Sequence, residues 1–123
     1  MSGIKYFLDT NAIIAFLGGN EKLNALLADA AWIGTSSIAI IEFLSFSHLD
    51  AIDSKIFQIF ISRIHVDAVS TNLLTLQQIA DIRREHKFKL PDAIIVAQSI
   101  TNNAVLISND KQLKAFTNQG FGF

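Results

Sequence analysis

The 123-residue chain has no cysteine, which excludes disulfide bonds and thiolate metal sites. It has almost no net charge, because 10 Lys and Arg stand against 11 Asp and Glu, so any nucleic-acid binding requires a local basic patch. No apolar run approaches the length of a membrane span, and no basic-then-apolar signal segment opens the chain. We therefore expect one intracellular, cytoplasmic domain over residues 1–123, with no membrane attachment.

Short apolar segments alternate with amphipathic ones along the chain. Strands are expected at residues 4–8, 32–35, 65–69, 105–108 and 120–123. Helices are expected at residues 12–17, 21–30, 37–48, 50–63 and 111–116, with a long helix capped by Thr71 or Asn72 and another carrying Pro91 in its first turn. This alternation predicts an α/β fold with a mostly parallel central sheet.

The first strand ends abruptly in an acid. Tyr6, Phe7 and Leu8 form an unbroken apolar run, typical of a strand buried on both faces, and Asp9 follows directly. Ligands of open parallel sheets gather beyond the carboxyl ends of the strands, which makes Asp9 a candidate site residue. Alternatively, Asp9 only caps the helix that starts near Asn11.

Glu42 is an acid in the middle of an apolar helix. Its neighbours three and four residues away are Ile38, Ala39, Ser45 and Phe46. An ionised Glu on such a face is costly unless it is paired or binds a metal, and no basic residue lies within a turn. We favour a functional role over a side chain that reaches solvent or pairs with a distant cation.

Two further acids begin later helices. Asp92 lies in the first turn of the helix containing Pro91, and Asp110 follows the strand at 105–108. Each has a simple explanation in dipole compensation or helix capping. However, Asp9, Glu42, Asp92 and Asp110 would all meet at one edge of a parallel sheet. Four carboxylates without His or Cys favour Mg²⁺ or Mn²⁺, which can clamp a phosphodiester and activate water.

Four stretches carrying these acids resemble the acidic motifs of PIN-domain nucleases. They are FLDTN, TSS with IIEFL, RREHKFKLPDAIIVA and LISND, and they occur in order over nearly the whole chain. The resemblance is strongest to the short VapC-like toxins of toxin–antitoxin pairs. It implies a three-layer α/β/α sandwich, Mg²⁺- or Mn²⁺-dependent cleavage of RNA, a homodimer, and a protein antitoxin that covers the site.

The same resemblance assigns site residues by motif position. It implies an acidic tetrad for catalysis and metal binding, formed by Asp9, Glu42, Asp92 and Asp110. Asn11 and Ser108 match the small polar positions beside the first and fourth acids.

Two other features agree with this interpretation. A cluster of Arg83, Arg84, His86, Lys87 and Lys89 precedes Asp92 and could hold RNA phosphates, although it could equally be a solvated helix end. The helix at 50–63 has an apolar arc wider than a surface helix needs, formed by Ile52, Ile56, Phe57, Ile59, Phe60 and Ile61. This arc indicates a partner surface. Alternatively, neighbouring elements cover it.

Two simpler assignments complete the expectations. The long helix after Asn72 is expected to turn an inner face of Leu73, Leu76, Ile79 and Ala80 towards the core. His48 and His65 have no ligand spacing and are interpreted as structural.

The rival interpretations come from three other functional classes. A haloacid-dehalogenase-type phosphatase would need a second acid where the chain has Asn11, and would leave Glu42 without a role. A phosphoryl-accepting receiver would need its acceptor Asp after a middle strand. A non-catalytic RNA- or protein-binding domain with the same fold stays open, and metal-dependent activity on single-stranded RNA would separate it from a ribonuclease.

Overall fold

The computed structural model describes residues 3–46 and 48–113 and contains a sheet of four parallel strands in the order β3-β2-β1-β4. The strands are β1 (Lys5–Leu8), β2 (Trp32–Ser36), β3 (His65–Asp67) and β4 (Val105–Ile107). Leu8 at the end of β1 pairs with Thr35 on one side and Ile107 on the other, so these strands end at the same level. The predicted parallel sheet is confirmed.

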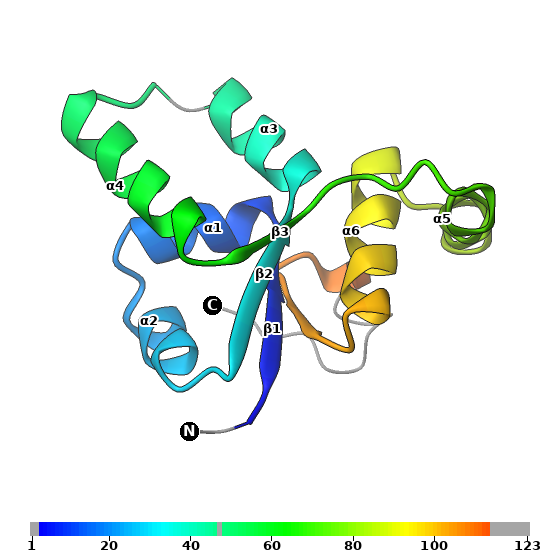
Figure 1. The fold of residues 1–123 in the computed structure, drawn as a ribbon, viewed down its shortest axis with the longest axis horizontal. Coiled ribbons are helices and arrows are strands. Elements are labelled where there is room, and N and C mark those ends of the chain that lie inside the picture. Colours follow the sequence, from blue (N-terminus) through cyan, green and yellow to red (C-terminus); the bar gives the residue numbers. More distant parts are fainter. Residues whose placement is uncertain (1–2, 47, 114–123) are drawn as a thin grey trace.

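Helices cover both faces of the sheet. They are α1 (Thr10–Leu17), α2 (Glu21–Ala28), α3 (Ser37–Phe46), α4 (Ala51–Ser62), α5 (Leu73–His86) and α6 (Leu90–Thr101). In Figure 1, α1, α2 and α4 lie on one side of the sheet and α5 and α6 on the other, while α3 stands near the carboxyl ends of the strands. The expected three-layer α/β/α sandwich is therefore confirmed.

Local sequence signals fix where several helices begin. Asp9, Asn20, Asp50 and Asn72 each accept a hydrogen bond from a backbone N–H in the first turn of the helix that follows. α6 has no side-chain cap, but it begins with Leu90 and Pro91, whose missing N–H has no intrahelical partner to lose. These signals explain why most predicted helix starts agree with the structure to within a residue or two.

The core lies between β1, β4 and α6. Tyr6, Phe7 and Leu8 are all buried, as expected for a strand covered on both faces. Residues 93–99 of α6 are buried without interruption, because α6 contacts α3, α5, β2 and β4. α6 therefore packs directly on the sheet, and its buried body fixes the place of its first turn beside the sheet.

Some boundaries differ from the expectation. The strand expected at 65–69 ends at Asp67, and the helix expected to reach residue 48 ends at Phe46. Residues 111–113 are helical, but the rest of the helix expected at 111–116 and the strand expected at 120–123 lie outside the described residues. Within the described part of the chain, no helix has the length and apolar character needed to cross a membrane.

The predicted inner face of α5 is wrong for three of its four residues. Only Ile79 is buried, whereas Leu73 and Leu76 are 78% and 39% exposed and Ala80 is also exposed. The reason is that α5 packs mainly on α6 and stands outside it, away from the sheet, as Figure 1 shows. A helix on the outside of a layer needs only a narrow buried stripe.

The wide apolar arc of α4 divides into a buried and an exposed part. Phe57 is 5% exposed and stacks on Phe43, with ring centroids 4.4 Å apart, and Phe60 packs against Phe16. The exposed part consists of Ile52, Ile56 and Ile59. The prediction of a partner surface therefore has to be restricted to these isoleucines, because Phe57 belongs to the core.

Candidate functional site

Asp9 sits at the junction of β1 and α1 and is buried, with 5% of the residue exposed. Its backbone N–H donates to the carbonyl of Ile107, which continues the β1–β4 ladder by one residue. Its Oδ1 accepts from the backbone N–H of Ala12 at 2.8 Å, so the predicted capping role is correct. Burial raises the pKa of the Asp9 carboxyl to about 6, against the hydrogen bonds from Ser108 and Ala12.

Ser108 joins the first acid to the fourth. It is completely buried at the end of β4, and its side chain hydrogen-bonds to the Asp9 carboxylate. Its Oγ also accepts from the backbone N–H of Asp110 at 3.0 Å. Asp110 is exposed, and its Oδ1 caps the helical turn that follows by accepting from the N–H of Gln112 at 2.8 Å. The ends of β1 and β4 thus hold two acids beside one buried hydroxyl.

Glu42 is held by a residue that sequence reasoning missed. Thr10 Oγ1 donates to Glu42 Oε1 at 2.8 Å, which connects the first turn of α1 to the middle of α3. Glu42 is half-buried rather than enclosed in the core, so the expected cost of burying its charge is smaller than the apolar pattern indicates. The sequence signal that could have identified Thr10 is its position directly after Asp9, at the carboxyl end of β1.

Asp92 completes the group from the other side. It lies half-buried in the first turn of α6, and α6 contacts α3, which carries Glu42. Its pKa is raised, first by burial and then by the negative charges of Asp110 and Glu42, while Lys89 opposes the rise. Asp92 and Asp110 also raise the pKa of Asp9. The four acids therefore lie within electrostatic reach of one another.

The site lies where the chain changes direction across the sheet. From β1, the next strands in sequence add on one side as β2 and β3, and β4 adds on the other. The crevice at such a switch point is the common ligand site of open α/β sheets, and Asp9 and Asp110 follow the two strands that border it. Asn11 is exposed in the first turn of α1, whereas Ser108 is buried and contacts both Asp9 and Asp110.

Carboxylate and hydroxyl oxygens are the donor set preferred by Mg²⁺ and Mn²⁺. Among residues 3–46 and 48–113, no three His, Cys, Asp or Glu side chains are grouped closely enough to hold an ion jointly. Mg²⁺ is commonly bound by one or two carboxylates and keeps several water molecules. The residues present therefore fit a hydrated ion, with Asp9 as the most buried acid of the group and Glu42 and Asp92 half-buried.

The other predicted residues lie around this centre. The basic residues Arg83, Arg84, His86, Lys87 and Lys89 are exposed along the end of α5 and the connection to α6. His65 packs its ring against Trp32, with centroids 5.2 Å apart, and hydrogen-bonds to Asp67. His48 is exposed, and neither histidine belongs to a metal-ligand group among the described residues.

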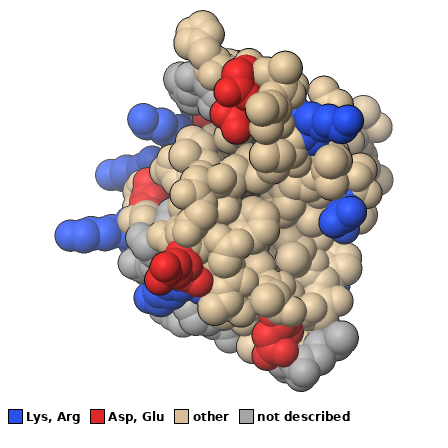
Figure 2. Space-filling model, turned by 90° about the vertical axis from the view of Figure 1, so that its left-hand side faces the viewer, with Lys and Arg blue, Asp and Glu red and all other residues tan. Residues whose placement is uncertain are grey.

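An uncharged face lies on the α1, α2 and α4 side of the molecule. Figure 2 shows that the centre of this face carries neither basic nor acidic side chains, and that charged residues are spread around its margin. Exposed apolar side chains on α1, α3 and α4 are Ile14, Ile41, Leu44, Ile52, Ile56 and Ile59. The face has the composition of a protein contact surface.

Solved structures with the same fold include a toxin–antitoxin complex and two VapBC structures bound to DNA. A toxin–antitoxin complex from Klebsiella pneumoniae is 23% identical, with a TM-score of 0.78 over 95% of this chain and 96% of that chain. VapBC2 from Rickettsia felis, bound to a promoter DNA fragment, is 23% identical, with a TM-score of 0.76 over 97% and 100%. DNA-bound VapBC from Salmonella typhimurium is 19% identical, with a TM-score of 0.73 over 94% of each chain. At these identities the likeness concerns the fold.

No curated protein sequence matches the chain. The family model of the PIN domain, however, matches residues 6–118, a span that contains all four acids and the whole described sheet except Lys5, the first residue of β1. The chain therefore belongs to the PIN domain family.

Proposed function

We propose that this protein is a Mg²⁺- or Mn²⁺-dependent endoribonuclease that hydrolyses RNA phosphodiester bonds in the cytoplasm, as the toxin of a toxin–antitoxin pair. The observation that carries the proposal is the group of four acids at the switch point of the sheet, with a buried Asp9 whose pKa is raised to about 6. Enclosing mutually repelling carboxylates is costly, and it is typical of sites where a cation compensates them.

Asp9 and Asp92 would hold the ion, with Asp110 and Glu42 at its margin. A bound divalent cation would supply charge neutralisation at the phosphate and a water of lowered pKa. Ser108 and the Ala12 N–H fix the Asp9 carboxylate, so its orientation does not have to be acquired when the substrate binds. Thr10 holds one oxygen of Glu42, which leaves the other oxygen to accept a proton from the attacking water.

The exposed apolar face and the solved structures with the same fold both support protein partners. The Klebsiella, Rickettsia and Salmonella proteins are complexes that contain a toxin and an antitoxin or are named VapBC. The exposed isoleucines of α4, together with the exposed Ile41 and Leu44 of α3, offer apolar side chains for contact with an antitoxin or with a second copy in a homodimer. We propose one PIN unit over residues 1–123 that uses this face for protein contacts.

The test is cleavage of single-stranded RNA by the purified protein. We expect cleavage with Mg²⁺ or Mn²⁺ and none after EDTA is added. RNA cleavage that continues in EDTA would contradict the metal requirement. RNA that stays intact with every divalent ion tried would favour the non-catalytic binding domain.

A further inference from the structure

A groove separates α5 from the beginning of α6 and has a volume of about 710 Å³. Its apolar walls include the buried residues Ile79, Phe88 and Ile94 and the more exposed Leu76 and Leu90. This volume lies within the range of pockets that bind small organic molecules. Leu90 begins α6, so the groove reaches the same first turn of α6 that carries Asp92.

The rim of the groove is basic although the whole chain is not. Arg83, Arg84 and Lys87 line the groove and Lys89 follows, so four of the 10 Lys and Arg residues lie within seven positions. An apolar floor with a cationic rim matches the chemistry of a nucleotide, which has a flat, apolar base face and an anionic phosphate. It matches an all-apolar protein segment less well, because such a segment leaves the cations unpaired.

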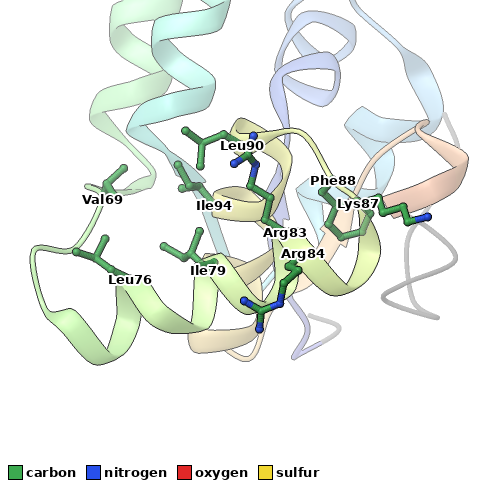
Figure 3. Close-up of a pocket in the computed structure, with 10 residues that line it drawn as sticks. Val69, Leu76, Ile79, Arg83, Arg84, Lys87, Phe88, Leu90 and Ile94 are labelled. Carbon is green, nitrogen blue, oxygen red and sulfur yellow. The ribbon is translucent and has the colours of Figure 1, made fainter.

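The two adjacent arginines are arranged differently. In Figure 3, Arg83 extends across the groove towards Leu90 at the start of α6, whereas Arg84 turns to the opposite side. The Arg84 guanidinium donates to Asp81 at 2.9 Å and its side chain is 70% exposed. Arg83 is thus the arginine that faces the first turn of α6 across the groove, and Arg84 is paired with Asp81.

Lys87 occupies a backbone position that normally favours glycine. It ends α5 in the left-handed conformation, with φ 56° and ψ 36°, where a side chain is disfavoured. Glycine would adopt this conformation without strain, yet the chain has a lysine there at the rim of the groove. A strained residue that carries a charge beside a groove is consistent with a binding role.

We propose that the groove between α5 and α6 seats one unpaired nucleotide of a single-stranded RNA, adjacent to the phosphodiester that reaches Asp92. The base lies on the apolar floor around Leu76, Ile79 and Phe88, and Arg83 pairs with a phosphate. The inference rests on the proposed ribonuclease function. It also limits the substrate, because a base within a duplex is stacked and paired and cannot enter the groove.

The experiment measures binding in a background that does not cleave. Fluorescence anisotropy gives the Kd of the Asp92→Asn protein for a short, labelled, mixed-sequence single-stranded RNA in Mg²⁺. In this background, Arg83→Gln should weaken binding about tenfold, because one charge-assisted phosphate contact is lost. Leu76→Gln should weaken binding about fivefold, because the base loses part of its apolar floor.

The chain supplies a matched control for each change. Arg63→Gln makes the same change at an exposed arginine that ends α4 and lies outside the groove, and Leu73→Gln makes the same change as Leu76→Gln at a leucine that is 78% exposed and also outside the groove. Each control should change Kd by less than about twofold. Lys87→Gly should weaken RNA binding while raising the melting temperature, because it removes both the charge and the strain, so the loss cannot come from misfolding.

The outcomes separate this inference from the proposed function. The same loss of RNA affinity for Arg83→Gln and Arg63→Gln would show a general charge effect and overturn the groove. Unchanged Kd and unchanged KM for RNA cleavage by the groove variants would also overturn it, while cleavage by the wild type would uphold the ribonuclease. Variants that keep RNA affinity but lose a co-purifying protein would assign the groove to a protein and overturn the nucleotide. A wild type that neither binds nor cleaves RNA would refute both.

Discussion

Asp9 caps α1 and at the same time lies among three other acids, so its two interpretations from sequence do not compete. The capping bond from Ala12 and the hydrogen bond from Ser108 stabilise the ionised carboxylate, and burial destabilises it more strongly. The net result is a carboxyl whose proton is lost only near pH 6 in the metal-free protein.

This pKa makes the stability of the metal-free protein depend on pH. The folded-state pKa of about 6 exceeds the ordinary value of 3.8, so the folded protein binds more protons than the unfolded chain between these pH values. Stability attributable to Asp9 is therefore highest below 3.8 and falls by about 3 kcal/mol as the pH rises past 6. Asp9→Asn keeps a capping oxygen and does not titrate.

We expect the free energy of unfolding of Asp9→Asn, relative to that of wild type, to increase by about 3 kcal/mol as the pH rises from below 3.8 to above 6. Chemical denaturation in EDTA at a series of pH values measures it. A stability difference that stays constant with pH would show that Asp9 titrates normally.

Asp92 separates electrostatic crowding from helix capping. The negative charge of Asp92 stabilises the start of α6 by about 0.3–1 kcal/mol. Burial and the charges of Asp110 and Glu42 all destabilise the ionised carboxylate. We expect Asp92→Asn to melt about 2–5 °C higher than wild type in EDTA at neutral pH. Added Mg²⁺ should raise the melting temperature of wild type more than that of the variant, because the ion binds the folded acids.

Thermal melts of both proteins with and without Mg²⁺ decide between the two effects. If Asp92 acts only through the helix dipole, the variant melts lower in EDTA and both proteins respond equally to Mg²⁺.

The sequence located the four acids and, through the family resemblance, Ser108 beside Asp9, but it did not identify Thr10 as the partner of Glu42. Asp9, Asp92 and Asp110 could be placed at one edge because strand ends and helix starts are local signals. Thr10 could not be assigned to Glu42, because the bond joins positions 32 residues apart and depends on how α1 packs on α3.

At the scale of elements, α4 shows what periodicity cannot resolve. Its arc of apolar residues was correctly identified, but the sequence does not say which part of the arc the fold covers. In the structure, Phe43 packs on Phe57 and Phe16 packs on Phe60. Ile52, Ile56 and Ile59 stay exposed. The same limit explains α5, where position in the outer part of a layer, not the sequence pattern, left Leu73 and Leu76 exposed.

The division of α4 predicts unequal costs for similar truncations. Phe57→Ala should reduce the free energy of unfolding by about 3–5 kcal/mol, because it leaves a cavity under the stacked ring of Phe43. Ile56→Ala should cost less than about 1 kcal/mol, because the residue is 50% exposed. Urea denaturation of the two variants gives both values, and equal costs would contradict the packing described for α4.

The exposed isoleucines predict association. Ile56→Asp should fold with near-wild-type stability but weaken self-association or antitoxin binding, because it places a charge among the exposed isoleucines of α4. Light scattering at several concentrations, and co-purification with a co-expressed antitoxin, measure the two effects. A wild type that is monomeric throughout and retains no partner would argue against a contact role for this face.

At the scale of the whole molecule, the order of the strands brings the distant acids together. Parallel strands put every carboxyl end at one edge, and the order β3-β2-β1-β4 places the ends of β1 and β4 side by side. Alternating strands and helices allowed this edge to be predicted from the sequence. The groove beside α5 could not be predicted, because it depends on the distance between two helices of the same layer.

The central claim is that the four acids form a metal-dependent catalytic centre for RNA. The most direct test compares the rates at which wild type, Asp92→Asn and Glu21→Gln cleave single-stranded RNA in saturating Mg²⁺ or Mn²⁺. Glu21 is an exposed acid in the first turn of α2, outside the acid group, and serves as the charge-matched control.

The account predicts that Asp92→Asn lowers the rate by about two or more orders of magnitude, that Glu21→Gln leaves it unchanged, and that EDTA abolishes cleavage. Equal rates for wild type and Asp92→Asn, or full activity in EDTA, would contradict it.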